Sequence, residues 1–130
     1  MKMPAGRYYV GDLCYVWHDE WDEFCNITID GNCVLDGVFS LKDGRQFATF
    51  GTMYGDGGYS DQNGSGYSVD AGLIGCVLVS DIDLSNTNND MDGGNVIEFS
   101  EDFEVSESDG IIRFGHIVID TSGQDDESDC

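Results

Sequence analysis

Tyrosine and aspartate side chains lie among glycines in the stretch from residue 51 to residue 75, which holds eight glycines, three tyrosines and three aspartates. Glycine lets a backbone approach a ligand closely, and tyrosine rings can stack on it. One hypothesis is therefore a pocket for a nucleotide or sugar, in a binding or sequestering domain or an enzyme. The other interpretation, which we favour, is a turn-rich part of a sheet on which the tyrosines pack. The pocket residues would be Tyr54, Asp56, Tyr59, Tyr67, Asp70 and His116.

A second group of oxygen-bearing side chains alternates just before Gly93 and Gly94, as in the first half of a calcium-binding loop. The match then fails, because the twelfth position is Phe99 and the nearest glutamate comes one place early. The flanks also have the composition of loop and strand, not of helices. A calcium-stabilised β domain is one hypothesis, and an Asn/Asp-rich surface loop is the other. The calcium ligands would be Asn88, Asp90, Asp92 and Glu98.

Patterns for catalysis or phosphate binding are incomplete. The stretch 55–58 is rich in glycine but lacks the following lysine and helix of a phosphate loop, and 66–70 departs from G-x-S-x-G at its last position. No CxxC pair occurs. Histidine and cysteine could meet in space, for example Cys76 with His116, but such pairings are recognised by geometry. We predict no catalytic residue, which leaves enzyme activity open but disfavoured.

Charge is the strongest signal in the composition: 26 acidic residues against five basic ones give a net charge of −21. Such a chain would repel phosphate, which excludes direct sequence-independent binding to nucleic acid, and it would also be repelled by anionic membranes. A solvated acidic surface is one interpretation. The leading hypothesis is a non-enzymatic acidic binding protein that acts on a basic or nucleic-acid-binding protein. In its more specific form, it is a phage or mobile-element inhibitor that mimics nucleic acid.

Acidic residues cluster in two segments that would form the partner-binding face. The first segment surrounds the predicted helix, and the second follows a predicted strand near residue 99. The candidates are Asp19, Glu20, Asp22, Glu23, Glu101, Asp102 and Glu104.

The expected cellular compartment depends on the apolar runs and the cysteines of the sequence. The N-terminal residues lack an apolar secretory region, and no apolar run approaches the length that spans a membrane. Five cysteines, an odd number, are typical of reduced thiols. We therefore expect a cytoplasmic protein without a membrane partner.

A short helix and a series of strands must position these residues. Trp17, Trp21, Phe24 and Cys25 recur at helical spacing, which predicts a helix at about 19–26, capped by Asp19 and packed on the core. From residue 27 onward apolar and polar residues tend to alternate with a period of two, which is typical of strands. The clearest hairpin joins 38–42 to 45–50 through Asp43-Gly44, a pair typical of a primed two-residue turn.

Other segments complete a mainly β fold. Strands at 57–59 and 67–69 could pair across Asn63-Gly64, and the apolar run 74–79 predicts a central strand covered on both faces. Roughly nine short strands predict an antiparallel β-sandwich or small β-barrel with one short N-terminal helix. Residues 1–121 would form one domain, and 122–130 a disordered acidic tail.

Three stretches resemble a family of small, acidic, uncharacterised bacterial and phage proteins. They are GRYYVGDLCY at 6–15, YGDG at 54–57 with VDAGLIG at 69–75, and FGH at 114–116. The likeness spans most of residues 6–120. It implies a prokaryotic or viral setting in the cytoplasm, and no activity or site residue.

Overall fold

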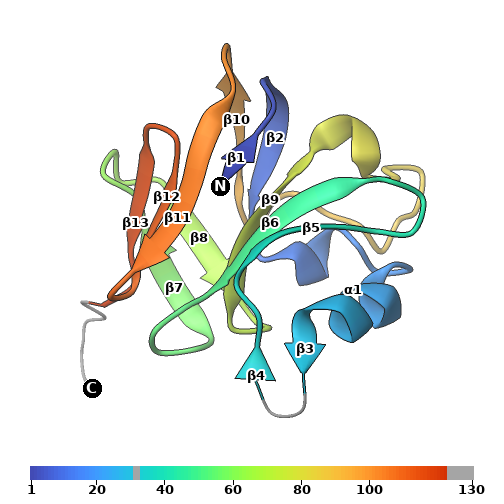
Figure 1. The fold of residues 1–130 in the computed structure, drawn as a ribbon, viewed down its shortest axis with the longest axis horizontal. Coiled ribbons are helices and arrows are strands. Elements are labelled where there is room, and N and C mark those ends of the chain that lie inside the picture. Colours follow the sequence, from blue (N-terminus) through green and yellow to red (C-terminus); the bar gives the residue numbers. More distant parts are fainter. Residues whose placement is uncertain (31–32, 123–130) are drawn as a thin grey trace.

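Antiparallel strands are the main regular elements of the computed structural model, which describes residues 1–30 and 33–122 (Figure 1). A five-stranded sheet has the order β10 (Asn95–Phe99), β2 (Gly6–Gly11), β9 (Leu73–Leu78), β6 (Gln46–Gly51), β5 (Gly37–Ser40). A four-stranded sheet has the order β1 (Lys2–Met3), β11 (Phe103–Ser108), β12 (Ile111–Phe114), β13 (Ile117–Asp120). Two small hairpins pair β3 (Ile29–Asp30) with β4 (Cys33–Val34), and β7 (Gly57–Ser60) with β8 (Gly66–Val69). The helical elements are α1 (Trp21–Thr28) and the short 3₁₀ turns η1 (Leu13–Tyr15) and η2 (Val79–Asp81).

The five-stranded sheet separates two hydrophobic cores. Ile74 and Cys76 of β9 point into the core shared with the four-stranded sheet and the β7–β8 hairpin. Leu73 and Val77 point to the other face, where α1 and η1 pack. This alternation confirms the central, doubly covered strand predicted for 74–79. In the described part of the chain no strand pairing closes either sheet, so the fold is the predicted sandwich and not the barrel.

The helix is confirmed, but it begins and ends two residues later than predicted. Glu20 occupies the N-cap position without a side-chain cap, and the carboxylate of Asp19 instead accepts a hydrogen bond from Asn86 at 3.0 Å. The prediction of Asp19 as the cap was therefore wrong. Trp17 precedes α1, yet it is buried and packs edge-on against Phe24 at a centroid distance of 6.4 Å. The core role predicted for these two rings is confirmed.

The turn of the clearest hairpin differs from the prediction. Gly44 has a φ of +95°, but Asp43 is not among the described residues with positive φ. Leu41 N–H donates to the Arg45 carbonyl, which leaves a three-residue loop typical of a type I turn followed by a glycine bulge. The primed two-residue turn lies instead at Asp109-Gly110, with φ values of +53° and +84°.

Short elements account for the remaining differences. The described chain has thirteen strands where about nine were predicted, because two-residue strands such as β1, β3 and β4 are too short to show a period. The predicted pairing of 57–59 with 67–69 is confirmed by β7 and β8. Most of the predicted acidic tail, residues 123–130, lies outside the described residues.

No helix within residues 1–30 and 33–122 is both long enough and apolar enough to cross a membrane.

Candidate functional site

The glycine-rich stretch buries two of its tyrosines. Tyr59 and Tyr67 face each other across β7 and β8, and both rings lie in the core between the sheets. The Tyr59 hydroxyl donates to the Gly55 carbonyl at 3.0 Å, and the Tyr67 hydroxyl donates to the Asp61 carboxylate at 2.7 Å. Their rings and hydroxyls therefore hold the hairpin, as the turn-rich interpretation expects.

The other predicted pocket residues are dispersed. Tyr54 and Asp56 are exposed on the turn before β7, and Asp70 is exposed beyond the end of β8. His116 lies on the turn between β12 and β13, where its carbonyl accepts a hydrogen bond from Gln62 at 2.6 Å. The structure thus brings the Tyr59–Tyr67 pair together but does not gather all six residues around one cavity.

Asp12 is a buried residue that is not among the site residues predicted from the sequence. Its carboxylate accepts backbone hydrogen bonds from Cys14 at 3.0 Å, from Asp70 at 2.8 Å and from Ala71 at 2.6 Å. It therefore fastens the end of the glycine-rich stretch to the end of β2. The pattern that could have revealed it is a lone aspartate between Gly11 and the apolar Leu13.

The predicted calcium ligands occupy a loop and a strand. Asp92 N–H donates to the Asp90 carboxylate at 2.7 Å, and Asn88 N–H donates to the Asn86 side chain at 3.0 Å, so these polar groups organise the loop itself. Glu98 lies on β10, opposite Arg7 of β2. Among the described residues, no three His, Cys, Asp or Glu side chains form a group that could hold a metal. The calcium hypothesis counts asparagine ligands as well, and it stays a prediction.

The described free thiols lie in environments that disfavour thiolate formation. Burial raises the pKa of Cys76, and burial together with a hydrogen bond to Asp12 raises the pKa of Cys14 to about 12. Burial also raises the pKa of Cys25. Because a thiolate is the nucleophilic form, none of these three cysteines is activated. Cys76 lies in the core while His116 is exposed, so the suggested pairing of these two residues is wrong.

A cleft at the corner between β10 and β11 unites residues from three separately predicted sets. It has a volume of about 190 Å³. It contains His116 from the pocket set, Glu98 from the calcium set, and Glu101 and Asp102 from the acidic face. The full lining is Glu98, Phe99, Ser100, Glu101, Asp102, Phe103, Gly115 and His116.

The corner itself explains how these residues meet. The chain leaves β10 in one sheet and enters β11 in the other within residues 100–102. Phe99 and Phe103 stack across this corner with a centroid distance of 3.7 Å. Gly115 has a φ of +57°, and a Cβ there would lie 3.0 Å from the Phe99 ring, so glycine lets the β12–β13 turn rest on the stacked pair. The turn places the His116 ring 5.4 Å from Phe99.

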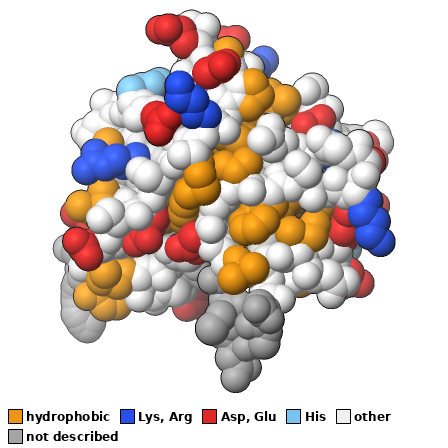
Figure 2. Space-filling model, in the orientation of Figure 1, with side chains coloured by type: hydrophobic (Ala, Val, Ile, Leu, Met, Phe, Trp, Pro, Cys, Tyr) orange, Lys and Arg blue, Asp and Glu red, His pale blue; other side chains and the backbone are white. Residues whose placement is uncertain are grey.

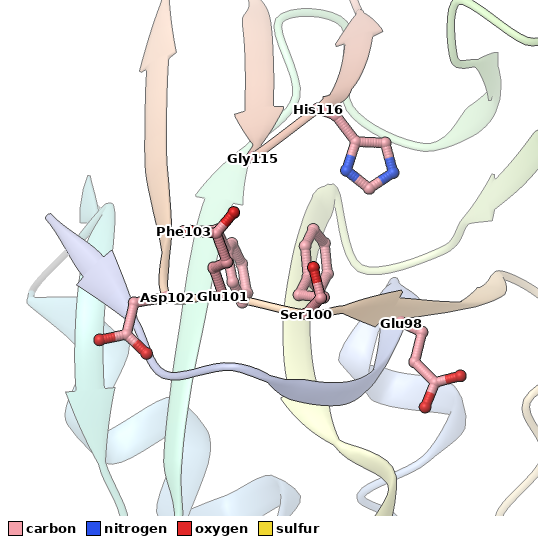
Figure 3. A pocket seen from close by; sticks show the side chains of 8 residues that line it. Glu98, Ser100, Glu101, Asp102, Phe103, Gly115 and His116 are labelled. Carbon is pink, nitrogen blue, oxygen red and sulfur yellow. The ribbon is translucent and has the colours of Figure 1, made fainter.

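The arrangement of polar groups in this corner cleft suits a cationic side chain. Figure 3 shows the His116 ring above the corner, with the carboxylates of Glu98 and Asp102 at opposite ends and directed apart. Asp102 also accepts a hydrogen bond from Ala5 N–H at 3.0 Å. In the described chain no hydrogen bond joins the side chains of Ser100 and His116. An aromatic floor with a carboxylate at its rim can take a lysine or arginine, whose apolar stem would lie on the rings and whose charged head would reach one carboxylate.

The acidic face predicted from the sequence divides into two parts. One part lies at the start of α1 and the other at the β10–β11 corner, and these lie apart in Figure 1. Near α1, Arg45 Nη1 lies 2.8 Å from the Glu20 carboxylate, and the guanidinium lies over the Trp17 ring at 5.8 Å. At the corner, Glu104 is 3.8 Å from the N-terminal amine.

A second groove lies between α1 and the edge strand β5. It has a volume of about 430 Å³ and is lined by Glu23, Asn26, Ile27, Ser40 and Lys42. The Glu23 carboxylate accepts a hydrogen bond from Lys42 N–H at 2.6 Å, which ties the helix to the β5–β6 turn. Alternation in the sequence predicted the hairpin, but it carried no signal for the groove, because helix and hairpin meet only in three dimensions.

Comparisons with known proteins give no information on the site. No family model, curated protein or solved structure matches this chain. The resemblance to small acidic bacterial and phage proteins therefore stays a prediction, and function has to be inferred from charge and geometry.

Proposed function

We propose that this chain is a non-enzymatic acidic binding protein whose partner is a basic protein. The observation that carries this proposal is that most exposed carboxylates in the described part of the chain have no cation within ion-pair distance. Among the described carboxylates other than Asp120, ion pairs engage only Glu20, Asp43 and Glu104, with Arg45, Lys2 and the N-terminal amine as the cations. With five basic residues against 26 acidic ones, most of the negative charge of the chain is uncompensated.

An uncompensated anionic surface has a direct physical effect on association. Its summed field attracts a positively charged protein over roughly the Debye length, which is about 8–10 Å at physiological ionic strength. Such steering raises the association rate and disfavours acidic partners. The corner cleft adds a place where one lysine or arginine of the partner can dock.

The more specific form of the proposal is mimicry of nucleic acid. A protein that binds nucleic acid presents a basic surface to phosphates, and an acidic protein can occupy the same surface. The resemblance to bacterial and phage proteins supports an inhibitor from a phage or mobile element as the biological setting. A prokaryotic cytoplasm is the proposed location.

The proposal is tested by capture followed by competition. The full chain is immobilised, exposed to a bacterial lysate at low salt, and eluted with rising salt. We expect a basic, nucleic-acid-binding protein to elute before about 1 M salt, where the Debye length falls to about 3 Å. Duplex DNA added to the purified complex should release the partner. Recovery of no basic protein, or of a complex that neither salt nor DNA dissociates, would overturn the proposal.

A further inference from the structure

The strand β5 ends the five-stranded sheet with backbone groups that face away from it. Leu41 N–H donates to the Arg45 carbonyl on the inner side of the hairpin. Because inward and outward residues alternate in an antiparallel pair, Phe39 faces β6 while Val38 and Ser40 direct N–H and C=O outward. Within the described chain no backbone hydrogen bond outside the β5–β6 pair involves Val38 or Ser40. An unpaired row of this kind is a template for another strand.

Other edges of the two main sheets are short or partly covered. The Gln62 side chain covers the edge of β13, because it accepts from Val118 N–H at 2.9 Å and donates to the His116 carbonyl at 2.6 Å. The start of β10 lies beside β8, where Ser68 N–H donates to the Gly93 carbonyl at 2.8 Å. β1 has two residues only. These edges are thus shortened or partly covered, whereas no described side chain or backbone group covers the outward groups of Val38 and Ser40 on β5.

One contact in the groove beside β5 shows that an outward N–H of this edge needs an acceptor oxygen. Lys42 is the next residue whose N–H points outward after Ser40, and it is satisfied by the carboxylate of Glu23 on α1. Farther along the same edge, no oxygen of the described residues takes this place for Ser40. The backbone of an added segment can supply the missing carbonyl there, with its side chains in the groove against Ile27.

Exposed apolar side chains lie at the ends of the two elements that form the groove, just after α1 and just before β5. Leu35 and Ile29 are 38% and 45% exposed. Met1, whose sulfur lies beside Gly37 of β5, is 60% exposed. Figure 2 shows hydrophobic side chains gathered in a band on this face of the molecule, with acidic side chains around it. Such a patch rimmed by charge is typical of an interaction site.

We propose that the β5 edge and its groove bind an extended basic segment of the partner protein as an added strand. Charge favours this occupant: Asp22 is exposed on α1 and Glu23 lines the groove, while Asp36 is exposed just before β5. Lys42 is the one cation in the lining and contributes the opposite sign. A second copy of this chain would bring another net charge of −21 against the first. The inference rests on the proposed function, because it names how the basic partner is held.

A backbone substitution tests the strand geometry. The probe is a short synthetic peptide of alternating lysine and valine, titrated by calorimetry at low salt. Ser40→Pro removes one outward N–H but leaves the β5–β6 hydrogen bonds intact, because that N–H does not face β6. We expect about tenfold weaker binding than with Ser40→Ala, which keeps the N–H. Failure of the peptide to bind the wild type, or equal binding by both variants, would overturn the inference.

A second pair of variants guards against an unfolded proline mutant. Asn26→Arg adds bulk and positive charge to the helix wall of the groove, and Ser106→Arg adds the same charge on exposed β11. Binding of the peptide should be weakened by Asn26→Arg at least several-fold more than by Ser106→Arg. Equal losses of binding in Asn26→Arg and Ser106→Arg would show that net charge, and not the groove, determines the affinity for the peptide. In that case the added strand is wrong, while a salt-sensitive complex with the basic partner would still uphold the proposed function.

Discussion

Removing the carboxylate of Asp12 should destabilise the whole molecule, because one buried side chain joins two distant segments. Asp12→Ala deletes the acceptor for the backbone N–H groups of Cys14, Asp70 and Ala71. The alanine side chain has no acceptor, so these three donors lose their partner at a position where Asp12 is fully buried.

The size of the effect follows from the number and kind of bonds lost. Hydrogen bonds to a charged group contribute about 1.5–3 kcal/mol each. The three donors here are partly buried, so water recovers some of this energy, and we expect a loss of about 3–4 kcal/mol in the free energy of unfolding. That corresponds to a fall in Tm of about 10–15 °C for a domain of this size. Asp12→Asn keeps one acceptor oxygen and should lose about 1–2 kcal/mol.

Chemical denaturation and amide exchange measure this prediction together. Asp56→Ala is the matched control, since it removes the same charge from an exposed aspartate and should change stability by about 0.5 kcal/mol or less. In the wild type, the amides of Asp70 and Ala71 should exchange slowly, and Asp12→Ala should release them. If Asp12→Ala is no less stable than Asp56→Ala, the anchoring role is refuted.

Two further predictions concern the glycine-rich stretch. Burial, followed by the hydrogen bond to Asp61, raises the pKa of Tyr67, so its contribution to stability is present below pH of about 10 and is lost as pH rises through the raised pKa. Tyr67→Phe should cost about 1–2 kcal/mol at neutral pH and make the alkaline loss of stability shallower, as followed by unfolding curves and tyrosinate absorbance; an unchanged alkaline slope would contradict this. Gly75→Ala would place Cβ 2.3 Å from the Ala48 carbonyl oxygen and should cost about 3 kcal/mol in urea unfolding. Gly58→Ala, with open space around it, should change stability by less than about 1 kcal/mol, and equal effects at both glycines would contradict the packing argument.

Local patterns predicted the elements whose signal lies within a few residues. The apolar run at 74–79 and the stripe of Trp17 and Phe24 identified the central strand and the helix that packs on the second core. Turn geometry was harder to predict, because Asp43-Gly44 and Asp109-Gly110 are both Asp-Gly pairs but form different turns. The difference depends on how many residues separate the strands, which pairing across the whole sheet decides.

The site residues were harder to predict because sets close in sequence separate in space. Glu20 was assigned to a partner-binding face, yet it is half-buried and paired with Arg45, which is 25 residues away. His116 and Glu101 came from different predicted sets but line one cleft. Both outcomes depend on tertiary contacts between distant segments. The acidic surface itself was readable from composition, since exposed carboxylates are the default for charged residues.

The central claim is that uncompensated surface carboxylates hold a basic partner, and the salt dependence of affinity tests it most directly. The Kd of the purified partner should be measured from low to high salt for the wild type and for Asp22→Asn combined with Glu101→Gln, two exposed sites in different parts of the acidic face. We predict that affinity falls steeply with salt, and that the double variant binds more weakly at low salt but converges with the wild type at high salt, where charges are screened. A Kd that is independent of salt, or a double variant that binds as tightly as the wild type at low salt, would contradict the claim.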